Sequence, residues 1–203
     1  MEIVRRYFQA AEQFKRTGMG KEQVDRLLNL MKKAGINEDF SPARSAALLK
    51  EETTGLPAGA MMLSDGTIVT GKTSTRLGAA SSLLMNALKA ATGVDMELEV
   101  ITDEAIEPIQ RLKTKSLGSR NPRLHPDETL IALSISSATS ELAAKVLGGL
   151  KMLRGCDAFF SVIVSARDEE TYRRLGIIYA ANRSMKRLAH QELAEGPPTH
   201  SLI

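Results

Sequence analysis

The polar loop Leu117–His125 holds four side chains that could bind or transform a ligand. Arg120, Asn121, Arg123 and His125 lie within six residues, in a segment that also contains a glycine and a proline. A loop of this composition has a bent, fixed backbone and lacks the apolar periodicity of a core element. Binding sites are commonly built on such loops beside buried elements. The sequence therefore predicts a ligand site at this loop.

Each of these side chains has a functional and a structural interpretation. Arg120 could hold a carboxylate or a phosphate through paired N–H groups, or it could pair with an acidic side chain, and the sequence favours neither. For Arg123 the structural role is favoured, and Asn121 before a proline is typical of a turn. His125 could transfer a proton near neutral pH, although a histidine that stabilises a turn is the more ordinary case.

A second polar segment, Gly71 to Thr75, follows an expected β-hairpin. The sequence from Gly66 to Thr73 matches the Walker phosphate-loop pattern letter for letter. However, residues 67–70 are all β-branched and belong to a predicted strand, and a paired strand cannot curl its N–H groups around one phosphate. We therefore interpret the match as accidental. Lys72, Thr73 and Ser74 still lie at a strand end before a helix, a position that favours anions.

Two serines complete the predicted site. Ser136 and Ser137 close the apolar stretch at residues 129–136, which we interpret as a strand buried on both faces. Their hydroxyls could donate to a ligand at the end of that strand, or they could satisfy the first N–H groups of the next helix. The predicted ligand-binding residues are Lys72, Thr73, Ser74, Arg120, Asn121, Ser136 and Ser137.

Metal ligands are scarce in this sequence. The single cysteine, Cys156, and the three histidines, His125, His190 and His200, lack the spacing of a metal-binding motif. Cys156 follows a glycine beside an apolar stretch, which is typical of an inert core thiol. We expect no zinc, and the sequence leaves any other cofactor unknown.

The composition indicates a globular domain with a nearly balanced surface charge. The 203 residues include 27 basic and 24 acidic side chains, and only 4% are aromatic. Because nucleic-acid-binding proteins concentrate basic charge and offer rings for stacking, we expect no nucleic-acid partner. Apolar runs are too short to span a membrane, and the first residues do not resemble a secretory signal. One cysteine per chain indicates a reducing, cytoplasmic compartment.

The first part of the chain is expected to be helical. Apolar residues recur at helical spacing over residues 3–14 and 24–34, and a glycine ends each pattern. A third helix is expected at about residues 42–53. We therefore predict a helical subdomain over residues 1–55. Its apolar faces could pack on the rest of the chain or contact another chain.

The pattern changes after residue 56 to strands that alternate with helices. Asp65-Gly66 between two apolar runs predicts a β-hairpin. Further strands are expected at 96–101, 129–136, 158–164 and 177–180. This order predicts an α/β fold, a three-layer mixed-sheet domain over residues 56–185 that resembles the cytidine-deaminase-like fold. Residues 186–203 contain Gly-Pro-Pro, and we expect them to form a disordered tail.

Four stretches resemble a bacterial family called domain of unknown function 1846. They are Ile-Val-Thr-Gly-Lys at 68–72, the nine-residue loop at 117–125, Ile-Ala-Leu-Ser-Ile at 131–135 and Leu-Arg-Gly-Cys at 153–156. The loop is the most specific of the four. The resemblance covers about residues 2–180 and implies that the chain corresponds to the C-terminal part of longer proteins.

The resemblance implies a fold rather than an activity, because no biochemical function is established for the family. Family proteins carry a larger N-terminal region with a glycine-rich, phosphate-loop-like segment, which this sequence does not contain. An activity located there is therefore not transferred to this chain. Residues after 181 depart from the family pattern. We expect a natural short form, a fragment or one piece of a split protein.

Two functions are compatible with these observations, and the sequence does not decide whether the domain is an enzyme. The first is a site for an anionic metabolite, with phosphate as one candidate group. In any catalysis there, Lys72 would be the electrophilic or acid group and His125 the proton relay. The second is an oligomerisation or partner-interaction module for the N-terminal region of the family. Lack of convergence between Lys72 and Arg120 would count against the first, and a large exposed apolar face on the first two helices would favour the second.

Overall fold

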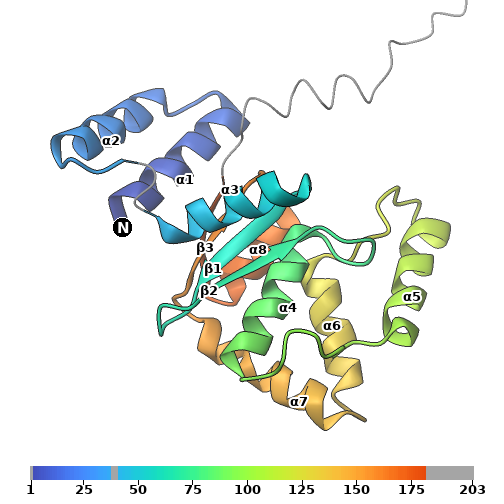
Figure 1. The fold of residues 1–203 in the computed structure, drawn as a ribbon. Helices are drawn as coiled ribbons and strands as arrows, with labels where there is room; N and C mark the ends of the chain where they lie inside the picture. Colours follow the sequence, from blue (N-terminus) through green and yellow to red (C-terminus); the bar gives the residue numbers. More distant parts are fainter. Residues whose placement is uncertain (1, 38–40, 182–203) are drawn as a thin grey trace, which may run out of the picture.

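A four-stranded mixed sheet lies at the centre of the protein. The structure is a computed structural model that describes residues 2–37 and 41–181. Its strands are β1 (Ala58–Met62), β2 (Ile68–Lys72), β3 (Asp157–Phe160) and β4 (Ile178–Ala181) (Figure 1). The strand order is β2-β1-β3-β4. Strand β1 is antiparallel to β2 and β3, whereas β3 is parallel to β4.

Helices precede the sheet and connect its strands. Those before the sheet are α1 (Glu2–Thr17), α2 (Lys21–Lys33) and α3 (Pro42–Thr54). Those after the hairpin are α4 (Ala79–Ala91), α5 (Asp103–Arg111), the π-helical η2 (Leu112–Ser116), α6 (Pro126–Ser136), α7 (Glu141–Gly148), the 3-10 helix η3 (Gly149–Leu153) and α8 (Ala166–Arg174). Within the described ranges, none of them has the length and apolar character needed to cross a membrane.

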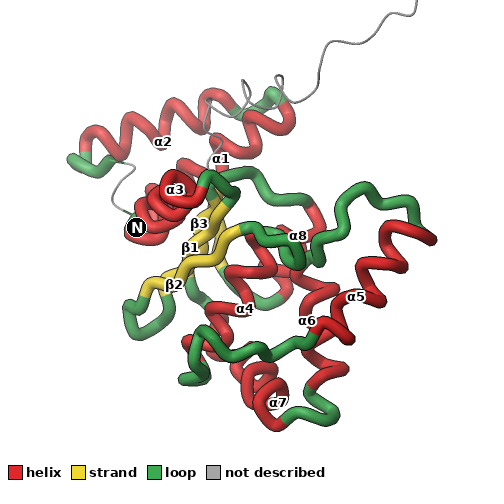
Figure 2. Tube along the Cα trace, turned by 45° about the vertical axis from the view of Figure 1, so that its right-hand side comes forward, coloured by secondary structure: helices red, strands yellow, loops and turns green. Residues whose placement is uncertain are grey.

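Helices cover both faces of the sheet because adjacent strand residues point to opposite sides. Ala60 and Phe159 pack with residues of α1 and α3, whereas Met61 and Phe160 pack with residues of α4 and α8. Figure 2 shows α3 and α4 on opposite sides of the strands. The described chain is therefore a mixed α/β fold. The predicted domain boundary at residue 55 stays a prediction. Helix α3 belongs to the helical layer that packs on the face of Ala60 and Phe159.

The hairpin is found at the predicted place. Residues Ala58 to Met62 pair with Lys72 to Ile68, and Gly66 takes a positive φ of 86° in the turn. The carboxylate of Asp65 accepts a hydrogen bond from the N–H of Thr67 at 2.9 Å, which stabilises this turn. Since residues 68–72 are paired along their length, they cannot form a phosphate loop.

The stretch Thr129–Ser136 is helical, so the predicted buried strand is wrong. Helix α6 begins at Pro126, which suits a first helical position because it lacks an N–H donor. The Glu128 carboxylate accepts the N–H of the preceding cap residue at 2.9 Å. Ile131 and Ile135 lie one turn apart and are 56% and 64% exposed. Apolar residues on both sides of the helix remove its amphipathic pattern, and the run then resembles a buried strand.

Residues 96–101 form turns instead of the predicted strand. The Lys89 ammonium donates to the carbonyls of Met96 and Leu98 at 2.9 and 2.5 Å, so these groups are not available to a sheet. Pro108 lies inside α5, which continues into η2, and does not begin a separate helix. The predicted strands at 158–164 and 177–180 correspond to the shorter β3 and to β4. The predicted tail at 186–203 lies outside the described residues.

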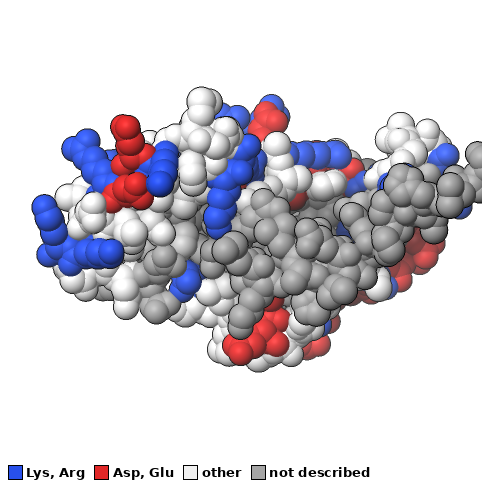
Figure 3. All heavy atoms as spheres, turned by 90° about the horizontal axis from the view of Figure 1, so that it is seen from above, with Lys and Arg blue, Asp and Glu red and all other residues white. Residues whose placement is uncertain are grey.

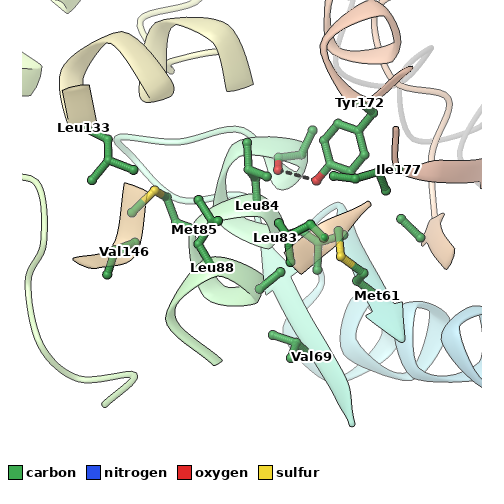
Figure 4. Close-up of a cluster of buried hydrophobic side chains, with 14 of the residues drawn as sticks. Met61, Val69, Leu83, Leu84, Met85, Leu88, Leu133, Val146, Tyr172 and Ile177 are labelled. Carbon is green, nitrogen blue, oxygen red and sulfur yellow. Dashed lines mark hydrogen bonds between the residues drawn. The ribbon is translucent and has the colours of Figure 1, made fainter. Parts of the chain in front are cut away.

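The larger core lies between the sheet and the helices α4, α6, α7 and α8 (Figure 4). Leu83 and Leu84 of α4 are fully buried there. Tyr172 of α8 is also buried, and its hydroxyl donates to the carbonyl of Ala80 at 2.8 Å. Burial raises the pKa of this hydroxyl well above its usual value. The bond fixes α8 against α4, so that the helices on this face form one layer.

A polar seam joins α1 to α8 and β4. Arg16 binds the carboxylate of Glu12 at 2.6 Å and that of Glu169 at 3.1 Å. The Gln9 amide donates to the carbonyl of Tyr179 in β4 at 3.3 Å. Burial raises the pKa of Glu12, which is only 7% exposed, although Arg16 acts in the opposite direction. The seam fixes the first helix to the last elements of the described chain.

Replacing Gly71 by Ala is expected to destabilise the fold. A Cβ at this position would lie 2.3 Å from the backbone nitrogen of Leu83, so β2 and α4 would have to separate. We expect Gly71→Ala to lower the free energy of unfolding by about 3 kcal/mol, measured by urea denaturation. Gly148→Ala is the control, because a Cβ there would meet no atom of another segment within 4 Å and its φ is −59°. Equal midpoints for the two variants would contradict the prediction.

The buried Glu12 gives stability a defined pH dependence. Its folded-state pKa is raised above the ordinary value of 4.5, so the folded state holds this proton more tightly than the unfolded state. Between the two pKa values the free energy of unfolding therefore falls as pH rises. We expect wild type to lose stability relative to Glu12→Gln as pH rises above the ordinary pKa of 4.5, measured by urea midpoints. A difference that is constant or opposite in sign would contradict this.

Candidate functional site

The two polar segments predicted from the sequence lie side by side. The N–H of Leu124 donates to the carbonyl of Arg76 at 2.9 Å, and the carbonyl of Leu124 accepts the N–H of Gly78 at 3.3 Å. Leu77 and Leu124 form an isolated parallel bridge. The loop at 117–125 is therefore held against the turn that precedes α4.

Arg123 has the structural role that the sequence favours. Its Nε donates to the carbonyl of Ser74 at 2.7 Å, and its own carbonyl accepts the ammonium of Lys113 at 2.6 Å. Asn121 behaves as a turn residue, because its side-chain oxygen accepts the N–H of Arg123 at 3.2 Å. Arg120 is exposed, and its side chain has no partner among residues 2–37 and 41–181. Within these ranges, Arg120 is thus a free cation near the tip of the loop.

A buried ion pair between Lys113 and Glu128 stabilises the loop at 117–125. Lys113 is 6% exposed and Glu128 is 7% exposed, and their charged atoms lie 2.6 Å apart. Arg167 of α8 approaches the same carboxylate at 3.0 Å and binds Asp127 at 2.7 Å. Sequence reasoning missed Lys113, because a lysine inside a polar stretch gives no sign of burial. The position of Glu128, three residues after a helix cap, was an available signal.

His125 joins the start of α6 to the start of α8. Its Nδ1 lies 2.7 Å from a carboxylate oxygen of Asp168, and the other oxygen accepts the N–H of Ser165 at 3.3 Å. Asp168 also forms a capping box with Ser165 at the start of α8. This arrangement fixes the ring of His125 and separates the residue from the cavity described next.

Ser136 and Ser137 lie at the far end of α6, about 16 Å along the helix from the loop. Their hydroxyls donate to the helix carbonyls of Ala132 and Ser134 at 2.9 and 2.7 Å. The strand end at which they were predicted does not exist, because this segment is the turn between α6 and α7. The structure therefore does not bring these serines together with Lys72.

A cavity of about 270 Å³ lies between the end of β2, α4 and the turns at 99–101. We call it the β2–α4 cavity. It is lined by Lys72, Ser74, Arg76, Leu77, Ser82, Met85, Asn86, Lys89, Glu99, Val100, Ile101 and Ile106. Two of the predicted residues, Lys72 and Ser74, line it, whereas Thr73 is buried and Arg120 and Asn121 do not belong to the lining. Lys72 and Arg120 therefore do not converge on this cavity.

The three cations that line the cavity differ in their partners. Arg76 is held by Glu99 and Asp103, each at 2.6 Å. Lys89 is held by the two carbonyls of the 96–98 turn, and burial lowers its pKa. The side chain of Lys72 has no hydrogen-bond or ion-pair partner in the described part of the chain. It is the cation most available to a ligand.

In the turn before α4, backbone N–H groups donate to oxygen atoms of the protein itself. The carbonyl of Leu124 accepts both the N–H of Gly78 and the hydroxyl of Ser81, the latter at 2.7 Å. The hydroxyl of Ser74 accepts the N–H groups of Arg76 and Leu77 at 3.2 and 3.0 Å. The N–H groups of Arg76, Leu77 and Gly78, in the turn before α4, are therefore not open to an anion.

Sequence reasoning missed five polar residues of the cavity. Four lie on α4 and the turn before it, and one on the irregular segment after it: Arg76, Ser82, Asn86, Lys89 and Glu99. The signal for three of them was the spacing of polar residues at 82, 86 and 89, which repeats at one helical turn. Within the described ranges, no three His, Cys, Asp or Glu side chains come close enough to hold a metal ion.

Replacing Lys113 by Met is expected to loosen the loop and lower stability. The change leaves the Glu128 carboxylate buried without its nearest cation, so we expect the free energy of unfolding to fall by about 3 kcal/mol in urea denaturation. Lys115→Met is the matched control, because Lys115 is exposed on the same π-helical turn, and we expect a change within about 0.5 kcal/mol. Similar losses for both variants would show that the buried pair has no special role.

Comparison with known proteins places the chain among longer bacterial proteins. The family model described as "Domain of unknown function DUF1846, C-terminal" matches residues 39–188. A UPF0371 protein of Corynebacterium efficiens is 46% identical over 188 residues, which cover 93% of this chain and 38% of that protein. A UPF0371 protein of Corynebacterium diphtheriae is 48% identical over 181 residues, covering 89% of this chain and 36% of that protein.

The similarity extends beyond one genus. A UPF0371 protein of Streptococcus thermophilus is 40% identical over 176 residues, covering 87% of this chain. The chain spans only 36% to 38% of the length of these relatives. Their printed names assign no reaction or ligand. On the strength of the family match and of these identities, the chain belongs to the DUF1846 family, in which it corresponds to the C-terminal domain.

Proposed function

We propose that this domain binds a small metabolite, with an oxyanion group and an apolar body, in the β2–α4 cavity. The observation that carries the proposal is Lys72, an exposed lysine that lines the cavity and has no side-chain partner in the described residues. A cation without a partner at a concave site gains charge-assisted hydrogen bonds from an anion without breaking an existing pair.

The rest of the lining supports a ligand of mixed character. Met85, Ile101 and Ile106 supply apolar surface, whereas Ser82 and Asn86 supply polar groups. Binding sites for small molecules are typically apolar with a few oriented polar groups. A volume of about 270 Å³ suits a metabolite below the size of a nucleotide. A carboxylate and a phosphate are both candidate anionic groups.

The proposal assigns binding and not catalysis to these residues. His125, the predicted proton relay, is paired with Asp168 and does not line the cavity. Arg120 and Asn121 also lie outside the lining, so the loop would act as a support for the turn at 74–78. The initial hairpin, the parallel β3–α8–β4 unit and helices on both faces support a cytidine-deaminase-like fold. We propose that it works without zinc, in the cytoplasm.

Basic and acidic side chains both appear among the visible described residues of the face turned upward in Figure 1, some of them side by side (Figure 3). A nucleic acid would favour a continuous basic area. This observation supports a small molecule over a nucleic acid as the partner.

Replacing Lys72 by Ala is expected to weaken anion binding about tenfold, because a charge-assisted hydrogen bond is lost. The probe is 1-anilinonaphthalene-8-sulfonate, which combines an anion with an apolar body, and its fluorescence reports displacement by octanoate, octyl phosphate or octylamine. We expect the two anions to displace the probe from wild type and octylamine to fail.

Lys151→Ala is the matched control, since Lys151 is exposed on η3 and does not line the cavity. We expect it to bind as wild type does. Equal affinities for wild type and Lys72→Ala, or equal displacement by octylamine, would overturn the proposed site.

A second function has one observation in its favour. Ile131 and Ile135 of α6 are more than half exposed, although apolar residues on a helix are usually buried. The relatives are also much longer than this chain, so the domain could be an oligomerisation or interaction module. Failure of every anion to bind, together with a dimer in sedimentation velocity, would favour this function.

A further inference from the structure

Glu99 is an unusual member of a cavity that would attract anions. Among the described lining residues it alone carries a carboxylate. Its Oε1 accepts a hydrogen bond from Arg76 Nη1 at 2.6 Å. A carboxylate of the protein itself therefore already binds the guanidinium group to which an anionic ligand would bind.

Arg76 has a second carboxylate partner that does not line the cavity. Its Nη2 donates to Asp103 at the start of α5, also at 2.6 Å. One guanidinium group thus has one partner on the cavity wall and one outside it. If Glu99 leaves, Asp103 can still hold Arg76 in place.

The Arg76–Glu99 contact can be exchanged at low cost. The side chains of Arg76 and Glu99 are 42% and 55% exposed, and ion pairs of this kind contribute little to stability. The contacts of Lys89 with the carbonyls of Met96 and Leu98 are harder for a ligand to replace, because Lys89 is partly buried and has two fixed partners. The weak Arg76–Glu99 pair therefore lies in the cavity, where an anionic ligand would compete with Glu99 for Arg76.

The backbone next to Glu99 does not need to move for this exchange. Lys89 fixes the carbonyls of Met96 and Leu98, so the wall of the cavity is attached to α4. The N–H of Glu97 is bound by Asp95 at 2.9 Å, which tightens the same turn. The Glu99 side chain is 55% exposed, so it can turn towards solvent and leave Nη1 while Asp103 keeps Nη2.

We propose that Glu99 is an internal counter-ion that an incoming oxyanion displaces from Arg76, so that the anion contacts both Arg76 and Lys72. The inference rests on the proposed function and adds the way in which its site is regulated. Because Asp103 keeps Nη2, the anion takes the place of Glu99 at Nη1, and this charge-assisted hydrogen bond suits a carboxylate or a phosphate. The affinity of the site is set by competition with a charge of the protein itself.

The test compares two carboxylates that pair with the same guanidinium. Octanoate and octyl phosphate are titrated by displacement of 1-anilinonaphthalene-8-sulfonate from wild type, Glu99→Gln and Asp103→Asn. We expect Glu99→Gln to bind the anions about three- to fivefold more tightly, since a competing charge is removed at an exposed pair. Asp103→Asn is expected to stay within about twofold of wild type. The preferred anion distinguishes a carboxylate ligand from a phosphate ligand.

A double-mutant cycle shows whether Glu99 acts through Arg76. In an Arg76→Met background, Glu99→Gln is expected to give no further gain in affinity. Equal affinities for wild type and Glu99→Gln, an equal gain in Asp103→Asn, or a gain that persists without Arg76 would each overturn the inference. If wild type and Glu99→Gln both fail to bind, the proposed function itself fails. Binding that depends on Lys72 but not on Glu99 would support the proposed function and overturn the inference about Glu99.

Discussion

The close approach of β2 to α4 is the contact on which the rest of the structure depends. Gly71 permits it, because any Cβ would overlap the backbone at Leu83. The same approach positions the end of β2 beside α4, and the cavity with Lys72 forms at that junction. It also accounts for the Gly-Lys pair in the sequence without a phosphate loop. The glycine permits backbone packing, and the lysine that follows lines the cavity.

The sequence predicted those elements whose signals are local. The Asp65-Gly66 turn is specified by residues within a few positions of each other, and the hairpin is present where they predict it. The helix α6 was missed because its exposed isoleucines hide the helical period. The turns at 96–101 were missed because Lys89, seven and nine residues away, takes the carbonyls that a strand would use. Patterns within a short window cannot show such competition.

The site was predicted in part for a similar reason. Lys72 and Ser74 stand out because polar residues follow an apolar strand, and both line the cavity. Arg76 and Glu99 are 23 residues apart, and only the fold reveals that they meet. Lys113 and Glu128 are also distant, and nothing in a sequence marks a buried charge. Ser136 and Ser137 were assigned to the site through a strand that is a helix, so that error carried over from fold to function.

The packing of α1 constrains the order in which the protein can be completed. Phe8 stacks edge to face on Phe159 at a centroid distance of 5.0 Å, and Gln9 binds the backbone of Tyr179. A ribosome makes Phe8 first and Tyr179 some 170 residues later, which takes on the order of ten to thirty seconds. During this interval the apolar face of α1 has no final partner. Of the described helices, α1 is therefore made first, yet it is buried completely only after β3 and β4 have been made.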